Sequence, residues 1–473
     1  MHYEKFADGS VKCIEDEIPF DLPDGWVWGR LTTLLDIFIT GPFGSSLHKS
    51  DYVENGIPLI NPMNIVDGEI IPIDKMQISN ETVERLASFK VIPNDIVIAR
   101  RGDMGRCAVV HYTQTGWLCG TGSFVLRLST FLWPEYFAAC IRSPYAVTYL
   151  SGNSIGNTML NLNQAILKNL LLPVPPFKEQ KRIIDGINNA DAYLNQLSDE
   201  REHLIATVAK TKAKILDLAI RGQLVPQNPS DEPASVLLDR IRIEKEELIR
   251  QGKLKRDKKE SVIFRGDDNS YYEKVGDQRV CIDDDLPYSL PEGWVWCELQ
   301  DCCIKEIKRG RSPKYADNGH VLSFAQKCNQ KTGGINMGLA LLIDDSTACR
   351  YEDDEYLQDG DIVINSTGTG TLGRVGIYRA TDNLAGTPVV PDSHVTVVRV
   401  SSLLDPLYFF YCLKSMQSRL ETLGEGSTNQ KELKPLTVQQ LRIPIPPIAE
   451  QNEIVKQIVA LFGHLDAIAT DLT

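Results

Sequence analysis

The chain has 473 residues, of which 42% are hydrophobic and 24% charged, so it is ordinary globular material large enough for two to four domains. No apolar run reaches the roughly 18 residues of a membrane-spanning helix, and the N-terminus lacks the pattern of a secretory signal. The odd count of 11 cysteines, none in a C-x-x-C pair, favours reduced thiols. We therefore expect a cytoplasmic protein with no membrane segment. The net charge of −13 disfavours nucleic acid as a partner, although a local basic face still binds phosphates.

The N-terminal third of the chain is repeated further on. The sequence LPDGWVW at residues 22–28 reappears as LPEGWVW at residues 290–296. DIVI at residues 95–98, followed by Gly105-Arg106, matches DIVI at residues 361–364, followed by Gly373-Arg374. LPVPPFKEQ at residues 172–180 returns as IPIPPIAEQ at residues 443–451. Blocks matched at a nearly constant offset indicate that one module has been duplicated.

Each copy of the module has an α+β pattern. Short runs rich in β-branched residues at 57–60, 95–99 and 123–128 predict strands. Residues 134–142 and 406–418 predict helices that pack under the sheets. The polar stretches between matched blocks differ between the copies, as expected for two binding modules with different targets; drift on surface loops is the other explanation.

A long helix is predicted to follow each module. In residues 176–221 apolar residues alternate at spacings of four and three, which is the heptad seam of a coiled coil. This helix would be roughly 70 Å long, well beyond the ordinary globular helix. A similar seam follows the second proline-rich block, and antiparallel packing would place the modules at opposite ends of the rod. The seam residues are Ile183, Ile187, Leu194, Leu197, Leu204, Val208, Ile215, Ile454, Ile458, Leu461 and Leu465.

The segment after the first long helix is a linker with a helix of its own. A loop rich in proline, asparagine and serine at residues 225–233 leads into a predicted helix that ends at Arg250. The basic run at residues 253–259 is more typical of a solvated linker than of a specific site. The predicted domains are residues 1–174, a helical region 175–275, a second module 276–445, and a second long helix 446–473.

No stretch of the chain predicts a catalytic or metal site. The glycine-rich run at residues 368–373 fits G-x-G-x-x-G, but a strand-like pattern follows it where a dinucleotide site needs a helix, so we predict a hairpin loop. Asn61-Pro62-Met63-Asn64 lacks the second proline and the aromatic residue of an amino-methyltransferase motif. The paired tryptophans Trp26, Trp28, Trp294 and Trp296 favour a structural role in an edge strand over contact with DNA.

Together the duplicated module, the P-P-x-x-E-Q entry to a heptad helix and the P-x-G-W-x-W start resemble the DNA-specificity subunit of type I restriction–modification systems. The resemblance covers nearly the whole chain, including AIRGQLV at residues 219–225. It implies two globular target-recognition domains separated by an antiparallel coiled coil of two conserved helices, with internal pseudo-twofold symmetry. Each domain would read one half of a split, asymmetric site in double-stranded DNA. The second helix is shorter here than the first, which leaves open how the symmetry is completed.

The resemblance also implies the partners. The helices would set the gap and bind two modification (methyltransferase) subunits, joined by restriction subunits with translocase and nuclease activity. The methyl donor and ATP would belong to those subunits, so this chain is expected to hold no cofactor and to be a non-catalytic recognition subunit.

The loops expected to face DNA come from both modules. Phosphate contacts would fix the register and loop side chains would read bases. In the first module the candidates are Ser45, Ser46, Lys49, Asn61, Asn64, Arg100, Arg101, Arg106 and Asn163. In the second module they are Lys308, Arg309, Arg311, Lys314, Gln326, Lys327, Thr369, Thr371, Arg374, Thr428, Gln430 and Lys431. Residues 157–164, which contain Asn163, and residues 427–431 are candidates because the resemblance implies that the segment before the proline-rich helix entry approaches DNA.

Two other functions stay open from the sequence. One is a DNA-recognition module within a fused methyltransferase or nuclease, which needs a catalytic domain that no stretch of the chain supplies. The other is a non-catalytic coiled-coil adaptor that binds no DNA, which the negative net charge favours.

Overall fold

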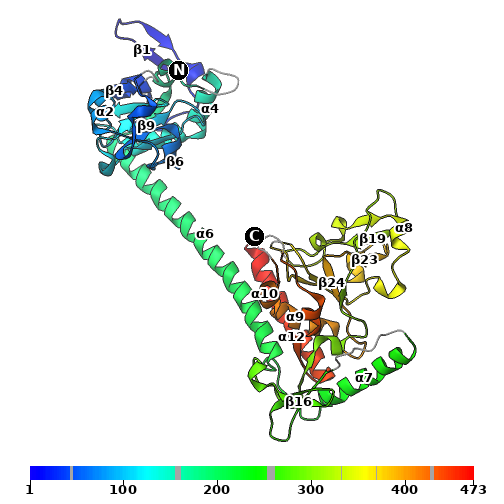
Figure 1. Cartoon of the computed structure of the whole chain (residues 1–473). Helices are drawn as coiled ribbons and strands as arrows, with labels where there is room; N and C mark the ends of the chain where they lie inside the picture. The colour runs from blue at the N-terminus through cyan, green and yellow to red at the C-terminus, as the bar shows by residue number, and fades with distance from the viewer. Residues whose placement is uncertain are drawn as a thin grey trace. The chain divides into compact units, whose positions relative to one another are not determined.

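The computed structural model describes residues 1–42, 46–154, 161–252, 261–331, 333–368, 370–426 and 431–472. The candidates Ser45, Thr369, Thr428 and Gln430 lie outside the described residues. The chain forms two compact units, Met1–Ser198 and Asp199–Thr473, and the long helix α6 (Phe177–Ile220) contributes to both. Figure 1 shows the elements of each unit. Among the described residues, no helix combines the length and the apolar character needed to cross a membrane.

Unit 1 is built on a four-stranded antiparallel sheet in the order β10-β9-β12-β4, which packs against helices α3 and α4. A second sheet, β11-β5-β8, contains the parallel pair β11 and β5. Two-stranded sheets join β3 to β13, β6 to β7 and β1 to β2. The strands are β1 (Tyr3–Lys5), β2 (Val11–Cys13), β3 (Val27–Arg30), β4 (Leu35–Thr40), β5 (Tyr52–Ile60), β6 (Ile65–Val66), β7 (Glu69–Ile70), β8 (Gln77–Ile78), β9 (Ile96–Ala99), β10 (Cys107–Val109), β11 (Leu118–Cys119), β12 (Ser123–Leu128) and β13 (Leu171–Val174). The helices before α6 are α1 (Leu31–Leu34), α2 (Asn80–Arg85), α3 (Pro134–Arg142), α4 (Pro144–Asn153) and α5 (Gln164–Lys168).

Unit 2 repeats this plan, which confirms the internal duplication. Its four-stranded sheet runs β18-β24-β21-β22, its mixed sheet runs β20-β19-β23, and β17 pairs with β25 as β3 does with β13. A three-stranded sheet, β14-β15-β16, precedes them. The strands are β14 (Ser261–Arg265), β15 (Tyr271–Val275), β16 (Gln278–Cys281), β17 (Val295–Glu298), β18 (Lys308–Arg309), β19 (Val321–Phe324), β20 (Leu341–Ile343), β21 (Ile362–Asn365), β22 (Val375–Ile377), β23 (Val389–Pro391), β24 (Val395–Val398) and β25 (Arg442–Ile445). The helices are α7 (Ala234–Arg250), α8 (Asp345–Ala348), α9 (Pro406–Ser415), α10 (Gln417–Thr422), α11 (Pro435–Gln439) and α12 (Ile448–Asp471).

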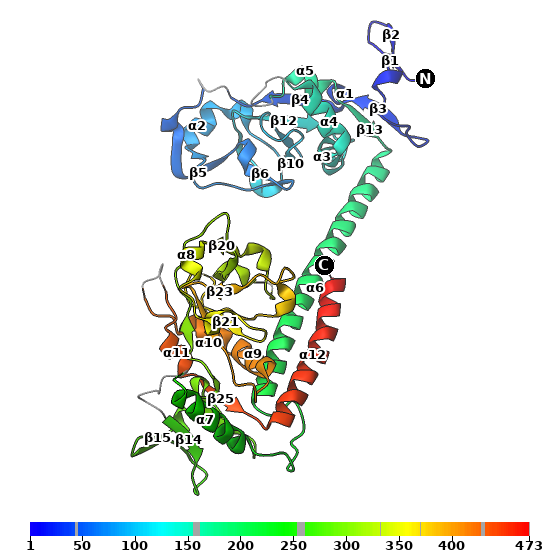
Figure 2. The ribbon, with the colours of Figure 1, turned by 90° about the vertical axis from the view of Figure 1, so that its right-hand side faces the viewer.

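Helix α12 packs antiparallel to the part of α6 that belongs to unit 2 (Figure 2). The Arg201 guanidinium group donates to the Leu472 carbonyl, and the Lys212 ammonium group pairs with Asp466. Near the start of α12, Gln227 donates to Glu450 at 2.6 Å. The predicted antiparallel helix pair is therefore present, and Ile454 and Ile458 of α12 are fully buried in the core of unit 2.

The predicted seam is covered over only part of α6, in keeping with a second helix that is shorter than the first. Val208 and Ile215 are buried, whereas Ile187, Leu194, Leu197 and Leu204 are 42%, 64%, 62% and 40% exposed. The cause is length, because α12 has 24 residues against 44 in α6 and ends beside Arg201. The remaining seam residues, Ile183, Leu461 and Leu465, are half-buried against their own cores.

The linker helix α7 belongs to the core of unit 2. Its apolar face contributes Ala234, Leu237, Leu238 and Ile241, all buried, to the same cluster as Trp294. Gly222, with φ of +66°, follows the C-terminal end of α6. Residues 234–250 and 261–275, grouped with the helical region by sequence, thus pack against the second module.

Candidate nucleic-acid interface

Loops that are far apart in the sequence of module 1 converge where the strands of its main sheet end: Gly41 follows β4, Arg100 follows β9, and Gly122 precedes β12. The Arg100 N–H donates to the Gly122 carbonyl at 2.8 Å, and the Leu162 N–H donates to the Arg100 carbonyl at 2.9 Å. The Gly120 N–H donates to the Ile60 carbonyl at 2.8 Å. We call this surface rim 1; it comprises Gly41 and residues 61–64, 100–106, 120–123 and 161–163.

Module 2 builds the same arrangement with matching hydrogen bonds. The Ser366 N–H donates to the His394 carbonyl at 2.8 Å, and the Leu433 N–H donates to the Ser366 carbonyl at 2.8 Å. Ser366 therefore occupies the place of Arg100. We call this surface rim 2; it comprises Gly310 and residues 326–329, 365–368, 370–374, 391–394 and 431–433.

A glycine permits the close approach of chains in each rim. A Cβ atom on Gly41 would lie 1.8 Å from the Gly120 carbonyl oxygen, and one on Gly310 would lie 1.9 Å from the Pro391 carbonyl oxygen. The Gly41 N–H donates to Ser123 and the Gly310 N–H donates to Val395. Any larger residue would separate the loops that form the rim.

Two arginines at equivalent positions hold the rims together. Arg106 donates from Nη1 to the Pro62 carbonyl at 3.2 Å and pairs with Asp103. Arg374 donates from Nη1 to the Asn329 carbonyl at 2.7 Å and from Nη2 to the Gly370 carbonyl at 3.0 Å. Both were predicted to contact DNA directly. Their bonds to neighbouring loops also give them the task of positioning those loops.

Other predicted candidates are also engaged within the rims. Asn64 is 2% exposed, accepts from the Asn61 N–H and donates to the Ile71 carbonyl, so it shapes its loop from inside. The Thr371 hydroxyl oxygen lies 2.9 Å from the Thr367 carbonyl oxygen, to which it donates, and 3.2 Å from Gln326 Oε1. Asn163 caps α5 by accepting from the Ile166 N–H.

The exposed groups on the two rims differ in chemistry. Rim 1 presents Arg101, while the Arg100 guanidinium group stacks 4.8 Å from the Phe124 ring. Partial burial and the neighbouring Arg101 lower the pKa of Arg100. Rim 2 presents Lys327, His394 and Lys431. His394 was not among the predicted candidates, because no motif in the sequence marks it; its ring Nδ1 lies 2.7 Å from the Thr367 hydroxyl.

Several candidates lie beside the rims rather than on them. Arg85 donates to the Ser46 carbonyl next to α2, and Lys49 is exposed in the same region. Lys314 pairs with Asp344 at 3.3 Å, away from rim 2. Arg309 pairs with Glu432 at 2.6 Å and donates to the Leu433 carbonyl, so it fastens residues 431–433 to β18.

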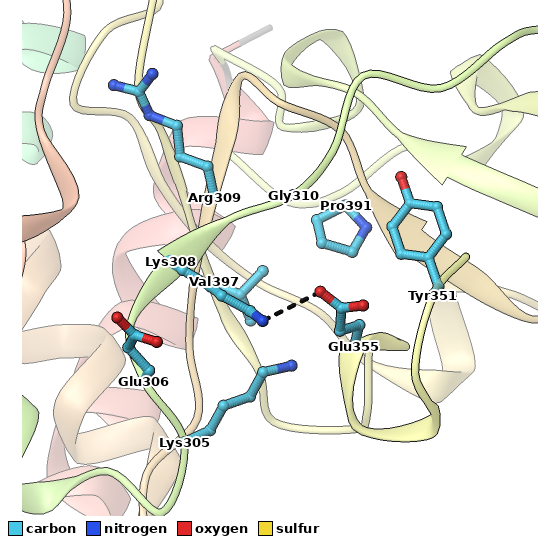
Figure 3. A pocket seen from close by; sticks show the side chains of 9 residues that line it. All are labelled: Lys305, Glu306, Lys308, Arg309, Gly310, Tyr351, Glu355, Pro391 and Val397. Carbon is cyan, nitrogen blue, oxygen red and sulfur yellow. Dashed lines mark ion pairs between the residues drawn. The ribbon is translucent and has the colours of Figure 1, made fainter. Parts of the chain in front are cut away.

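A small pocket next to rim 2 contains an ion-pair network (Figure 3). Lys308 points toward Glu355 at 3.1 Å, whereas Arg309 points away from it. Arg311 pairs with the same carboxylate at 2.8 Å. Burial would raise the pKa of Glu355, but the Glu352 N–H and the two cations outweigh it and lower the pKa. The paired charges give this pocket a structural role. Within the described ranges, no group of three or more His, Cys, Asp or Glu residues is placed to hold a metal ion.

Comparison with known proteins supplies the context for this arrangement. The model of the type I restriction modification DNA specificity domain matches the chain twice, over residues 23–206 and 291–472. The EcoEI specificity subunit of Escherichia coli is 24% identical over 530 aligned residues, which cover 98% of this chain and 82% of that protein. The EcoAI specificity subunit of Escherichia coli is 27% identical over 334 aligned residues, 60% of this chain and 52% of that protein. The HsdS subunit from Thermoanaerobacter tengcongensis has a similar fold, with a TM-score of 0.55, 16% identity, and coverage of 96% of this chain and 93% of that one.

Proposed function

The chain belongs to the type I restriction modification DNA specificity family, and we propose that rim 1 and rim 2 each read one half of a bipartite, asymmetric DNA site. As a specificity subunit it selects the sequence on which a type I complex acts. The observation that supports two separate readers is the pair of rims, which share backbone hydrogen bonds but present different exposed groups.

The rims suit DNA by their chemistry as well as their repetition. Arginine and lysine side chains on loops contact phosphates and guanine edges, and these contacts fix register and sequence respectively. Rim 1 provides Arg101 and rim 2 provides Lys327 and Lys431, all exposed. The chain's negative net charge of −13 is then a property of the remaining surface.

Catalysis and cofactors are assigned to partner subunits in this proposal. The chain acts as a non-catalytic recognition subunit, and the methyl donor and ATP bind to modification and restriction subunits. The exposed half of the α6 seam, with Leu194 and Leu197, is the surface that we assign to docking a modification subunit.

The test is to purify the chain with its neighbouring modification subunit and to map the methylation of modified DNA. We expect a split motif with a fixed gap. Arg101→Ala should weaken DNA binding by the complex roughly 5- to 150-fold, the range of a lost base or phosphate contact. Lys12→Ala is the matched control, because Lys12 is an exposed cation on β2, outside rim 1.

Two results would contradict the proposal. Methylation of a single continuous motif would leave one rim without a role. Failure of the complex to bind any DNA would favour a non-catalytic adaptor instead.

A further inference from the structure

The two modules carry the same face beside their W-x-W strands, and the described residues cover only one of these faces. Face 1 consists of Pro23, Gly25, Trp26, Thr32 and Glu179 in module 1. Face 2 consists of the equivalent Pro291, Gly293, Trp294, Gln300 and Glu450 in module 2. The strand pairs beneath them have the same register, since Trp28 lies opposite Pro173 and Trp296 opposite Pro444.

The local backbone of the two faces is also the same. Gly25 and Gly293 have φ of +85° and +84°. The Trp26 N–H donates to the Pro23 carbonyl at 3.1 Å, and the Trp294 N–H donates to the Pro291 carbonyl at 3.3 Å. A segment that fits face 2 therefore meets a similar backbone on face 1.

Residues 222–250, which we call the cover segment, pack on face 2. A Cβ atom on Gly222 would lie 2.4 Å from Pro291 Cγ and 3.1 Å from Trp294 Cζ2, so the backbone of the segment touches both rings. The Ala234 N–H donates to the Gly293 carbonyl at 2.9 Å. The Lys245 ammonium group donates to the Gln300 carbonyl at 3.1 Å.

Gln227 of the cover segment completes a polar cluster on face 2 whose other members, Trp294 and Glu450, are buried. It donates to Glu450 at 2.6 Å and accepts from Trp294 Nε1 at 3.1 Å. Trp294 Nε1 also donates to Glu450 at 2.8 Å. Under the cover segment Trp294 is 4% exposed and Glu450 5% exposed.

On face 1 the equivalent groups are more exposed to solvent. Pro23, Gly25 and Thr32 are exposed, and Trp26 and Glu179 are half-buried. The small sheet at the start of each module differs in the same way. β1 has the Tyr-Glu-Lys sequence that β15 has at residues 272–274. β15 pairs with both β14 and β16, whereas β1 pairs with β2 alone among the described strands.

We propose that face 1 is the docking site for a segment of a partner protein that has the chemistry of residues 222–250, namely an extended Gln-Leu-Val-Pro-Gln entry followed by an amphipathic helix. The second glutamine of this entry would form hydrogen bonds with Glu179 and Trp26, as Gln227 does with Glu450 and Trp294. The apolar side of the helix would cover the surface around Leu34 and Leu35, which are half-buried where the equivalent Cys302 and Cys303 are fully buried.

The probe is a fluorescent peptide of residues 222–250, titrated into the full chain and followed by anisotropy and by hydrogen–deuterium exchange. We expect saturable binding with protection of residues 22–35 and 173–180. Trp26→Ala should weaken binding at least tenfold or so, since buried tryptophans dominate interfaces. Glu179→Gln should weaken binding by a smaller factor. This nearly isosteric change is the second test of face 1, in case Trp26→Ala disturbs the fold. Tyr112→Ala, which changes an 82% exposed aromatic residue of module 1 outside face 1, should have no effect.

Several outcomes would overturn the proposal. They are the absence of saturable binding, equal affinity for the Glu179→Gln and unaltered chains, and protection of residues 290–303 in place of face 1. Self-association of the full chain that Trp26→Ala abolishes would show instead that face 1 binds another copy of module 1.

Discussion

At the scale of single residues, the glutamine of the repeated P-P-x-x-E-Q block has the same structural role in both modules. Gln180 accepts from the Trp133 N–H and donates to the Pro175 carbonyl, both at 2.9 Å. Gln451 makes the same two bonds, with the Asp405 N–H at 3.2 Å and the Pro446 carbonyl at 2.9 Å. Each side chain is buried, so it ties the start of a long helix to the start of the module helix.

Replacing this glutamine should destabilise the module that contains it. Gln451→Ala leaves the Asp405 N–H and the Pro446 carbonyl without their partner, which costs about 1–3 kcal/mol of unfolding free energy. Chemical denaturation followed by circular dichroism measures the change. Gln457→Ala, on the half-buried outer side of α12, is the control and should change stability by less than about 0.5 kcal/mol. Equal effects of the two changes would refute the role given to Gln451.

Glu450 makes the stability of unit 2 depend on pH. Burial raises its pKa above the ordinary 4.5, although the hydrogen bonds from Trp294 and Gln227 oppose this. The folded state therefore binds the proton more tightly than the unfolded state. Its contribution is greatest below pH 4.5 and is lost as the pH rises through the raised pKa. Glu450→Gln should lack this loss. The unfolding free energy of the variant, relative to that of the unaltered chain, should therefore rise from about pH 4 to pH 7, as measured by chemical denaturation. Parallel pH profiles would contradict this.

At the scale of elements, α6 is stabilised unequally along its length. Ile458 of α12 is 1% exposed, whereas Leu194 of α6 is 64% exposed. Ile458→Ala should cost about 2–5 kcal/mol, because it leaves a cavity in the core of unit 2. Leu194→Ala should change the unfolding free energy by less than about 0.5 kcal/mol in the chain alone. A large loss from Leu194→Ala would mean that this stretch is buried in the chain alone.

The exposed stretch of α6 should matter for assembly. Leu194→Lys and Leu197→Lys place charges on the apolar seam and should abolish co-purification with the modification subunit. Asn188→Lys puts the same charge on the opposite side of α6 and should leave the complex intact. Retention of the complex by both seam variants would remove the docking role assigned to this stretch.

The sequence predicted most helices and strands, but not which of their surfaces are buried by other elements. The helix expected at residues 176–221 is α6, Phe177–Ile220, and the strand expected at residues 123–128 is β12. Periodicity predicts which side of α6 is apolar, but it does not show how far a partner reaches, and α12 stops beside Arg201. The rims depend on glycine contacts such as Gly41 against Gly120, between segments distant in sequence. The pattern could therefore suggest Asn64 and Arg106 as candidates, but not that both are bonded inside rim 1.

At the scale of the whole molecule, duplication separates the two tasks of recognition. Each module keeps its own scaffold, including a repeated ion pair between a buried aspartate and a partly exposed arginine, Asp95 with Arg127 and Asp361 with Arg399. Because the scaffold bonds are shared, side chains on one rim can change without changes on the other. The specificity of the chain is then the combination of two independent half-site preferences.

This independence predicts how single changes alter the methylated motif. Arg101→Ala on rim 1 should relax the sequence of one half-site, and Lys327→Ala on rim 2 should relax the other or weaken it uniformly if the lysine contacts phosphate. The gap between the halves should stay the same in both variants, because neither change touches α6. Methylation mapping of the complexes measures all three quantities. If Arg101→Ala altered both half-sites, or altered the gap, the rims could not be separate readers.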